Sequence, residues 1–119
     1  MIGGFNGENR ERSVHIFNTH TDEWLPGPEM QYRRSTLGVA LLDKKIYAIG
    51  GFDGQSGLMT AESLDLLTNT WSMIAPMSVR RSSVASCSLN NYIYASELNS
   101  IQNQERINDF FMISIVSIK

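Results

Sequence analysis

The 119-residue sequence repeats itself with a period of 47 residues, and this repeat constrains the fold more than any other feature. The tetrapeptide Ile-Gly-Gly-Phe occurs at residues 2–5 and again at 49–52, and Trp24 falls on Trp71 without a gap. Arg-Arg-Ser and Ile-Tyr-Ala recur at the same spacing. A unit of this size cannot bury its apolar face alone, so the copies must stack on one another. The repeat therefore predicts a row of similar units rather than one small independent domain.

Each period consists of short apolar runs separated by turn residues, as in β-strands. Residues 36–42 and 45–49 are joined by Asp43-Lys44, and the matching runs of the next copy are joined by Asn90-Asn91. Asn tolerates positive φ, so this pair suits a two-residue hairpin turn. We expect a third strand around residues 62–65, equivalent to residues 14–18, and a fourth strand that carries the tryptophan. Short strands at this spacing predict an all-β repeat architecture.

The pattern resembles the kelch repeat. The resemblance rests on Arg-Arg-Ser followed by an apolar strand, on Ile-Tyr-Ala-Ile-Gly-Gly-Phe-Asp-Gly at residues 46–54 and on Asn-Thr-Trp at residues 69–71. It covers residues 1 to about 97 and implies antiparallel four-stranded kelch blades of a partial β-propeller. The Asn-Thr-Trp sequence, Pro76-Met77 and the paired arginines are most similar to the kelch-like proteins that carry an upstream BTB domain.

The resemblance divides the chain into four parts. Residues 1–29 are the end of a first kelch repeat, residues 30–76 a complete repeat, residues 77–97 the start of a third, degenerate repeat, and residues 98–119 a divergent tail. In the third copy, Ser-Glu-Leu at residues 96–98 stands where Ile-Gly-Gly is expected. Family propellers close with about six blades. About two and a half repeats therefore predict a fragment, an aberrant splice product or a truncated gene product that cannot close a ring alone.

Charge and composition narrow the classes of function. The net charge of −2 gives no electrostatic footprint for nucleic acid or an anionic membrane surface. The longest apolar stretch, residues 110–118, is far shorter than the ~20 residues of a membrane helix. The lone Cys87 excludes an internal disulfide, and its alignment with Ala40 predicts a small, buried side chain. We expect a soluble protein that is cytoplasmic or associated with the cytoskeleton.

The sequence shows no constellation for catalysis, and we expect no enzyme activity, no metal and no cofactor. His15 and His20 lack recurring partners for metal or triad chemistry. The glycine-rich residues 51–57 return into a strand rather than a helix, which favours a turn over a phosphate-binding loop. Some kelch propellers are enzymes, such as oxidases that bind copper through Tyr and His. That alternative requires a cluster of titratable residues that this sequence does not offer.

The residues that define the repeat are expected to be structural. Double glycines suit a strand end where the backbone approaches a neighbour or adopts positive φ. The resemblance implies that both tryptophans pack in the core and that one arginine of each pair packs over the start of a strand. The structural set is Gly3, Gly4, Trp24, Arg34, Tyr47, Gly50, Gly51, Trp71, Arg81 and Tyr94.

The candidate partner-binding residues lie in loops. In an antiparallel meander, the loop between the second and third strands shares one side with the link between blades. In the kelch-like family this side binds partner peptides, and arginine is suited to the task because its planar fork engages a carboxylate. The candidates are Tyr32, Arg33, Phe52, Asp53, Gln55 and Arg80. For Arg33 and Arg80 a structural role is the open alternative.

The resemblance implies a protein–protein interaction module rather than an enzyme. In the kelch-like family the propeller recruits a ubiquitination substrate to a cullin-RING ubiquitin ligase, or it binds actin. A cullin would be reached only through a BTB domain, which this chain lacks. A truncated, non-functional gene product is the remaining alternative.

Overall fold

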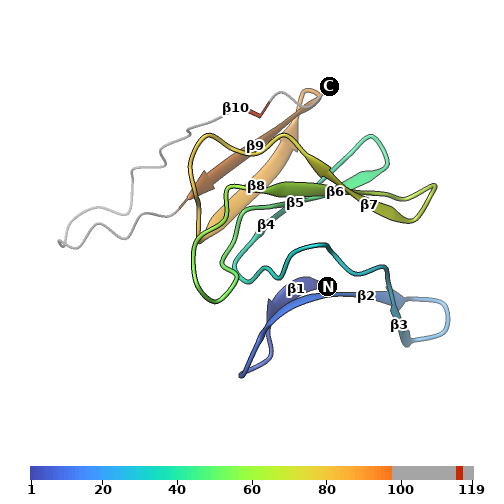
Figure 1. The fold of residues 1–119 in the computed structure, drawn as a ribbon. Coiled ribbons are helices and arrows are strands. Elements are labelled where there is room, and N and C mark those ends of the chain that lie inside the picture. Colours follow the sequence, from blue (N-terminus) through green and yellow to red (C-terminus); the bar gives the residue numbers. More distant parts are fainter. Residues whose placement is uncertain (98–114, 117–119) are drawn as a thin grey trace, which may run out of the picture.

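The computed structural model describes residues 1–97 and 115–116, and the regular elements in these ranges are all β-strands (Figure 1). This confirms the all-β prediction. The predicted tail, residues 98–119, lies outside the described residues except for one short strand. The strands are β1 (Ile2–Phe5), β2 (Arg10–Asn18), β3 (Glu23–Pro26), β4 (Gly38–Leu42), β5 (Lys45–Ile49), β6 (Ala61–Asp65), β7 (Thr70–Ile74), β8 (Val84–Leu89), β9 (Tyr92–Glu97) and β10 (Ile115–Val116).

The strands form three antiparallel sheets, which we call blades 1, 2 and 3. Blade 1 has the order β1-β2-β3, blade 2 the order β4-β5-β6-β7, and blade 3 the order β10-β9-β8. Figure 1 shows blade 1 in blue as a sheet separate from blade 2, and blade 3 in orange. Blade 2 is a complete four-stranded meander, as the kelch resemblance implies.

Two-residue turns close the hairpins at the expected positions. Asp43 and Lys44 have φ of 48° and 59° between β4 and β5, and Asn90 and Asn91 have φ of 48° and 66° between β8 and β9. Positive φ at both central residues matches the right-handed twist of the strands they join. The prediction of a tight Asn-Asn hairpin is confirmed.

The sequence repeat is also a repeat of hydrogen bonds. The Gly4 amide donates to the Arg34 carbonyl at 2.8 Å, and the Gly51 amide, 47 residues later, donates to the Arg81 carbonyl at 2.9 Å. The Arg34 amide donates to the Glu11 carbonyl, and 47 residues later the Arg81 amide donates to the Leu58 carbonyl. The Met30 amide likewise donates to the Arg12 carbonyl, and the Met77 amide to the Met59 carbonyl. These bonds connect each link between blades, residues 27–37 and 75–83, to the blade that precedes it in the chain. The sequence period is therefore a repeat of one backbone geometry.

The core lies between the blades. Each blade has a front face, turned toward the blade before it in the chain, and a back face, turned toward the blade after it. One cluster joins the back of blade 1 to the front of blade 2, and its buried members are Val14, Met30, Ala48, Leu64 and Trp71. The other joins the back of blade 2 to the front of blade 3, and its buried members are Ala40, Tyr47, Ile49, Ala61, Met77, Ile93 and Ala95.

Steric constraints explain why two consecutive glycines stand at the end of β5. Gly50 and Gly51 have φ of 58° and 95°, where side chains are strained. A Cβ atom on Gly51 would lie 2.5 Å from the carbonyl oxygen of Ser35, and one on Gly50 would lie 2.9 Å from a methyl carbon of Val84. The backbone at the end of β5 can approach the neighbouring link only because both residues lack a side chain.

Two expectations of burial are wrong. Trp24 is 60% exposed, whereas Trp71 is 6% exposed. Trp71 is on the front face of blade 2, which blade 1 covers, but Trp24 is on the front face of blade 1, which no described residue covers. Cys87 is exposed although its equivalent Ala40 is buried, because no described residue covers the back of blade 3 as blade 3 covers the back of blade 2.

Candidate binding face

The loops and links gather on one side of the blades, which we call the loop face. It comprises the loops at residues 6–9 and 50–60 and the links at residues 27–37 and 75–83. Ser35 in the first link and Phe52 in the second loop exchange two backbone hydrogen bonds of 2.9 Å. In the next copy the Arg81 amide donates to the Leu58 carbonyl at 3.0 Å. The predicted proximity of loop and link is confirmed.

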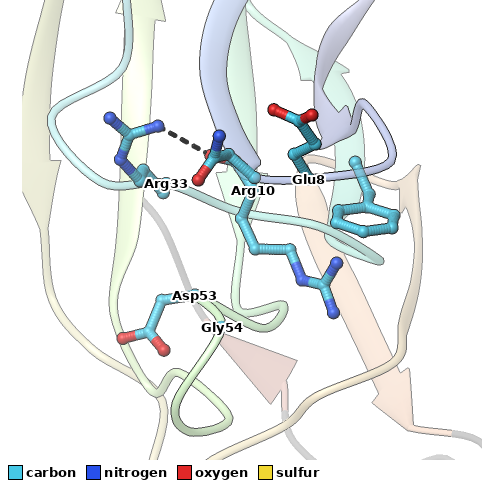
Figure 2. Close-up of a pocket in the computed structure, with 7 residues that line it drawn as sticks. Glu8, Arg10, Arg33, Asp53 and Gly54 are labelled. Atoms are coloured by element: carbon cyan, nitrogen blue, oxygen red, sulfur yellow. Dashed lines mark hydrogen bonds between the residues drawn. The ribbon is translucent and has the colours of Figure 1, made fainter.

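An open pocket of about 300 Å³ lies on the loop face where blade 1 meets blade 2 (Figure 2). It brings together two of the predicted candidates, Arg33 and Asp53. The other candidates, Tyr32, Phe52, Gln55 and Arg80, are outside its lining. The lining residues are Phe5, Glu8, Asn9, Arg10, Arg33, Asp53 and Gly54.

Arg10 is one of five lining residues that are not among the predicted candidates. Its guanidinium carbon is 4.0 Å from the centroid of the Phe5 ring and 5.4 Å from that of Phe52. Its Nε atom is buried and has no hydrogen-bond partner among the described residues. Within the described residues, neither the Arg12–Glu29 nor the Arg34–Glu62 ion pair includes Arg10. Arg10 aligns with Gly57, and comparison of the copies therefore gives no signal for it.

Arg33 and Arg80 make the same contact in successive copies. Arg33 donates from Nη1 to the Arg10 carbonyl at 2.8 Å, and Arg80 donates from Nη1 to the Gly57 carbonyl at 3.0 Å. Both side chains are exposed. In each copy, one guanidinium nitrogen of the arginine thus bonds the link to the neighbouring loop. The rest of each guanidinium group belongs to an exposed side chain.

Arg34 lies inside the structure and fastens the link to blade 2. Its Nε and Nη2 atoms donate to one Glu62 carboxylate oxygen at 3.1 and 3.0 Å, and its Nη1 atom donates to the carbonyls of Gly50 and Thr60 at 2.9 Å each. Both side chains of the Arg34–Glu62 pair are fully buried. Burial lowers the pKa of the Arg34 guanidinium, and the bond to Glu62 opposes this shift. Arg81 holds the equivalent position and is also buried.

The loop candidates Tyr32, Phe52 and Gln55 lie outside the lining of the pocket. Tyr32 is exposed, with the Arg34 guanidinium 5.7 Å from its ring centroid. Phe52 is half-buried and faces Arg10, while Gln55 is an exposed turn residue.

Asp53 shapes the loop of blade 2 as Asn6 shapes the loop of blade 1. The Asp53 Oδ1 atom accepts the amides of Gln55 and Ser56 at 2.8 and 2.9 Å, and the Asn6 Oδ1 atom accepts two amides in the same way. The backbone bonds from Ser56 and Gln55 hold the pKa of the Asp53 carboxyl below its ordinary value of 3.8. Asp53 is therefore a charged turn residue at the edge of the pocket.

Replacing Asp53 with alanine is expected to lower the free energy of unfolding by about 1 kcal/mol, because two loop amides lose their acceptor. Asp53→Asn keeps the acceptor, as Asn6 does, and is expected to lose only the part of the free energy of unfolding that depends on the charge. The pKa of the Asp53 carboxyl is lower in the folded state than in the unfolded chain, so the ionised carboxylate stabilises the fold above pH ~3.8. This stabilisation is lost as the pH falls through the lower, folded-state pKa. Urea unfolding of the three proteins between pH 7 and pH 2.5 measures this, and an equal loss in both variants would contradict it.

Neither a metal site nor a membrane helix is present in the described ranges. No group of three or more His, Cys, Asp and Glu side chains is placed there to hold a metal ion. The same residues form no helix long and apolar enough to cross a membrane.

Antiparallel blades that stack front to back with a 47-residue period define a repeat protein of the β-propeller type. The family model described as Kelch motif matches residues 2–31 and 33–78, which is more than half of the chain. The chain belongs to the kelch-repeat family. Kelch repeats serve in protein–protein interaction, and this chain therefore contains an interaction module.

Curated relatives match over one repeat length. The chain is 40% identical over 48 residues to Kelch repeat and BTB domain-containing protein 2 of Cowpox virus (strain GRI-90 / Grishak). The protein of the same name from Horsepox virus gives the same identity over the same length. Each alignment covers 40% of this chain but only 9% of the relative.

Proposed function

We propose that the loop face binds a partner protein and that the pocket between blades 1 and 2 takes an acidic side chain of that partner. The observation that carries the proposal is the position of Arg10. Its guanidinium is held against the rings of Phe5 and Phe52, has no ion pair within the described residues, and leaves a buried nitrogen without a hydrogen bond. Because the arginine fork can engage a carboxylate with two hydrogen bonds, an acidic group is the ligand that suits it.

The geometry around Arg10 favours binding at low entropic cost. Stacking on two aromatic rings restrains the side chain before a ligand arrives, so less rotamer freedom is lost on binding. Arg33, which also lines the pocket and donates to the Arg10 carbonyl, adds a second cation. The carboxylates of Glu8 and Asp53 at the rim disfavour ligands that present acidic groups over a wide surface. The proposed ligand is therefore a peptide segment with one or two acidic side chains.

At the level of the whole protein, we propose that this face recruits a substrate to a cullin-RING ubiquitin ligase. The names of the relatives, which pair kelch repeats with a BTB domain, support this proposal. Binding rather than catalysis is the proposed activity. It requires no cofactor, and the single cysteine fits a reducing, cytoplasmic location.

An array of short peptides tests the binding proposal, with each acidic peptide paired with the same peptide carrying Asn or Gln instead. The chain is expected to retain a subset of acidic peptides and to lose their amide counterparts. Arg10→Met is expected to weaken retention at least ~10-fold, as for an arginine anchor of an interface. Arg12→Met is the matched control, because Arg12 is exposed and already paired with Glu29.

Equal retention by the Arg10 and Arg12 variants would contradict the role of the pocket, and retention without regard to charge would contradict its chemistry. Co-sedimentation of the chain with actin filaments separates the alternative of cytoskeletal binding. Filament binding that survives Arg10→Met would favour that alternative.

A further inference from the structure

The loop between β1 and β2 carries an Asn-Gly pair at residues 6–7. In such a pair the backbone nitrogen of the glycine can attack the asparagine side chain, because glycine has no Cβ atom to obstruct the approach. Asn6 and Gly7 are exposed, and a Cβ atom on Gly7 would have no heavy atom within 4 Å apart from its chain neighbours. Gly54, the equivalent of Gly7, is exposed although blade 1 precedes blade 2. The open position of this loop tip therefore does not depend on a blade lacking a neighbour.

The hydrogen bonds of the loop favour this attack. The Asn6 Oδ1 atom accepts the amides of Glu8 and Asn9 at 2.9 and 2.8 Å. Both donors point at the oxygen on which negative charge develops when the Asn6 Cγ atom is attacked, so they stabilise that charge. The Gly7 amide donates no hydrogen bond to the part of the chain that the structure describes. No hydrogen bond to these residues has to break before the Gly7 nitrogen reacts.

We propose that Asn6 is a deamidation site and that its conversion weakens the pocket for acidic ligands, the second part resting on the proposed function. The Gly7 nitrogen, having lost its proton to solvent, bonds to the Cγ atom of Asn6. The Cγ–Nδ2 bond breaks, and the amide group leaves as ammonia with that proton. Water then opens the resulting succinimide ring and leaves an aspartate or an isoaspartate at position 6. The net reaction consumes water and releases ammonia, and nothing is oxidised or reduced.

Blade 2 shows that an aspartate fits this loop position. Asp53 and Gly54 are the equivalents of Asn6 and Gly7, and the Asp53 Oδ1 atom accepts two loop amides in the same way. The loop of blade 1 therefore keeps its turn when the product is aspartate. The Asp53 carboxyl itself resists the attack, because its lowered pKa keeps it ionised and an ionised carboxylate is a poor electrophile. Asn6 is therefore the reactive member of the two positions.

Deamidation changes the charge beside the pocket. The Asn6 Nδ2 atom donates to the Glu11 Oε1 atom at 2.6 Å, and a carboxylate oxygen in its place would repel Glu11. Asn6 directly follows Phe5, which lines the pocket and stacks on Arg10. The new negative charge therefore opposes the binding of an acidic side chain at Arg10.

Peptide mapping by mass spectrometry tests the conversion in the full chain, kept for days at mildly alkaline pH in heavy-oxygen water. Asn6 is expected to become an acid that carries the heavy oxygen. Asn9 is the internal control, because it is exposed in the same loop but is followed by Arg10. Gly7→Ala is expected to lose the conversion, as is Asn6→Gln, whose longer side chain cannot close a five-membered ring. An Asn6 side chain as stable as that of Asn9 would overturn the proposal, as would undiminished conversion in a folded Gly7→Ala variant.

Peptide retention on the array tests the effect on the pocket. Asn6→Asp is expected to weaken the retention of acidic peptides about 2- to 5-fold, the range for a single exposed charge. Asn18→Asp is the matched control, because it adds the same charge at the far end of β2 and keeps an acceptor for the His20 amide. Equal retention by the two variants would overturn the effect on the pocket. If the unmodified chain retained no acidic peptide, the proposed function would fail, whereas mass spectrometry alone decides the conversion of Asn6.

Discussion

Replacing Trp71 with alanine is expected to lower the free energy of unfolding by about 3–5 kcal/mol, the range for removal of a buried large aromatic side chain. Trp71 is 6% exposed and lies in the cluster between blades 1 and 2. Its Nε1 atom donates to the carbonyl of Pro28 in the preceding link at 2.7 Å. The variant loses apolar contacts, opens a cavity and leaves that carbonyl without its partner.

Trp24→Ala is the matched control, since it removes the same side chain from the equivalent repeat position. Trp24 is 60% exposed, so its loss is expected to cost less than about 1 kcal/mol. Far-UV circular dichroism during urea unfolding is the appropriate measurement, because both variants lose a fluorophore. Equal losses for the two variants would show that blade 1 does not cover Trp71 in solution.

Arg34→Met is expected to lower the free energy of unfolding by about 3–5 kcal/mol, because it leaves the carboxylate of Glu62 buried without its cation. Arg34 and Glu62 are both fully buried, and the loss of one partner does not remove the desolvation cost of the other. The variant also strips donors from the carbonyls of Gly50 and Thr60. The effect should therefore be large although the side chain is long and polar.

Arg33→Met is the control for Arg34→Met, because it removes the same charge one residue earlier from an exposed position. Its effect is expected to stay within about 1 kcal/mol. Combining Arg34→Met with Glu62→Gln removes the orphan charge while keeping an acceptor for the Gln31 amide. Urea unfolding of this double variant should recover part of the loss. Similar losses for Arg33→Met and Arg34→Met would contradict the assignment of the buried arginine.

The local geometry of the fold could be predicted from the sequence because its causes are local. The turn at Asn90 and Asn91 depends on residues that tolerate positive φ, and the double glycine at the end of β5 depends on the absence of side chains. The strands follow from short apolar runs at regular spacing. The period of 47 residues then predicts that these features recur, as the backbone hydrogen bonds do.

Burial at the ends of the row could not be predicted in this way. Trp24 and Trp71 occupy the same repeat position, but the exposure of each depends on whether another blade covers its face. Cys87 and Ala40 differ for the same reason. The repeat describes a blade by its internal pattern, whereas burial is a property of two neighbouring blades.

Of the candidate site, only the residues at recurring repeat positions could be predicted from the sequence. Arg33 and Asp53 belong to recurring loop and link positions, so the comparison of copies selects them, and the structure places both in one pocket. Arg10 has no counterpart in the next copy, where Gly57 stands. Its place in the proposed site depends on Phe5 and Phe52, which come from different parts of the sequence and contact it only in the folded chain.

Amide hydrogen exchange tests most directly the central claim that the 47-residue period is a repeat of the same joint between blades. The account predicts protection in matched pairs at Gly4 and Gly51, at Met30 and Met77, and at Arg34 and Arg81, because these amides donate to equivalent carbonyls in successive copies. Exposed loop amides should exchange freely. Protection of one member of each pair without the other would contradict the claim.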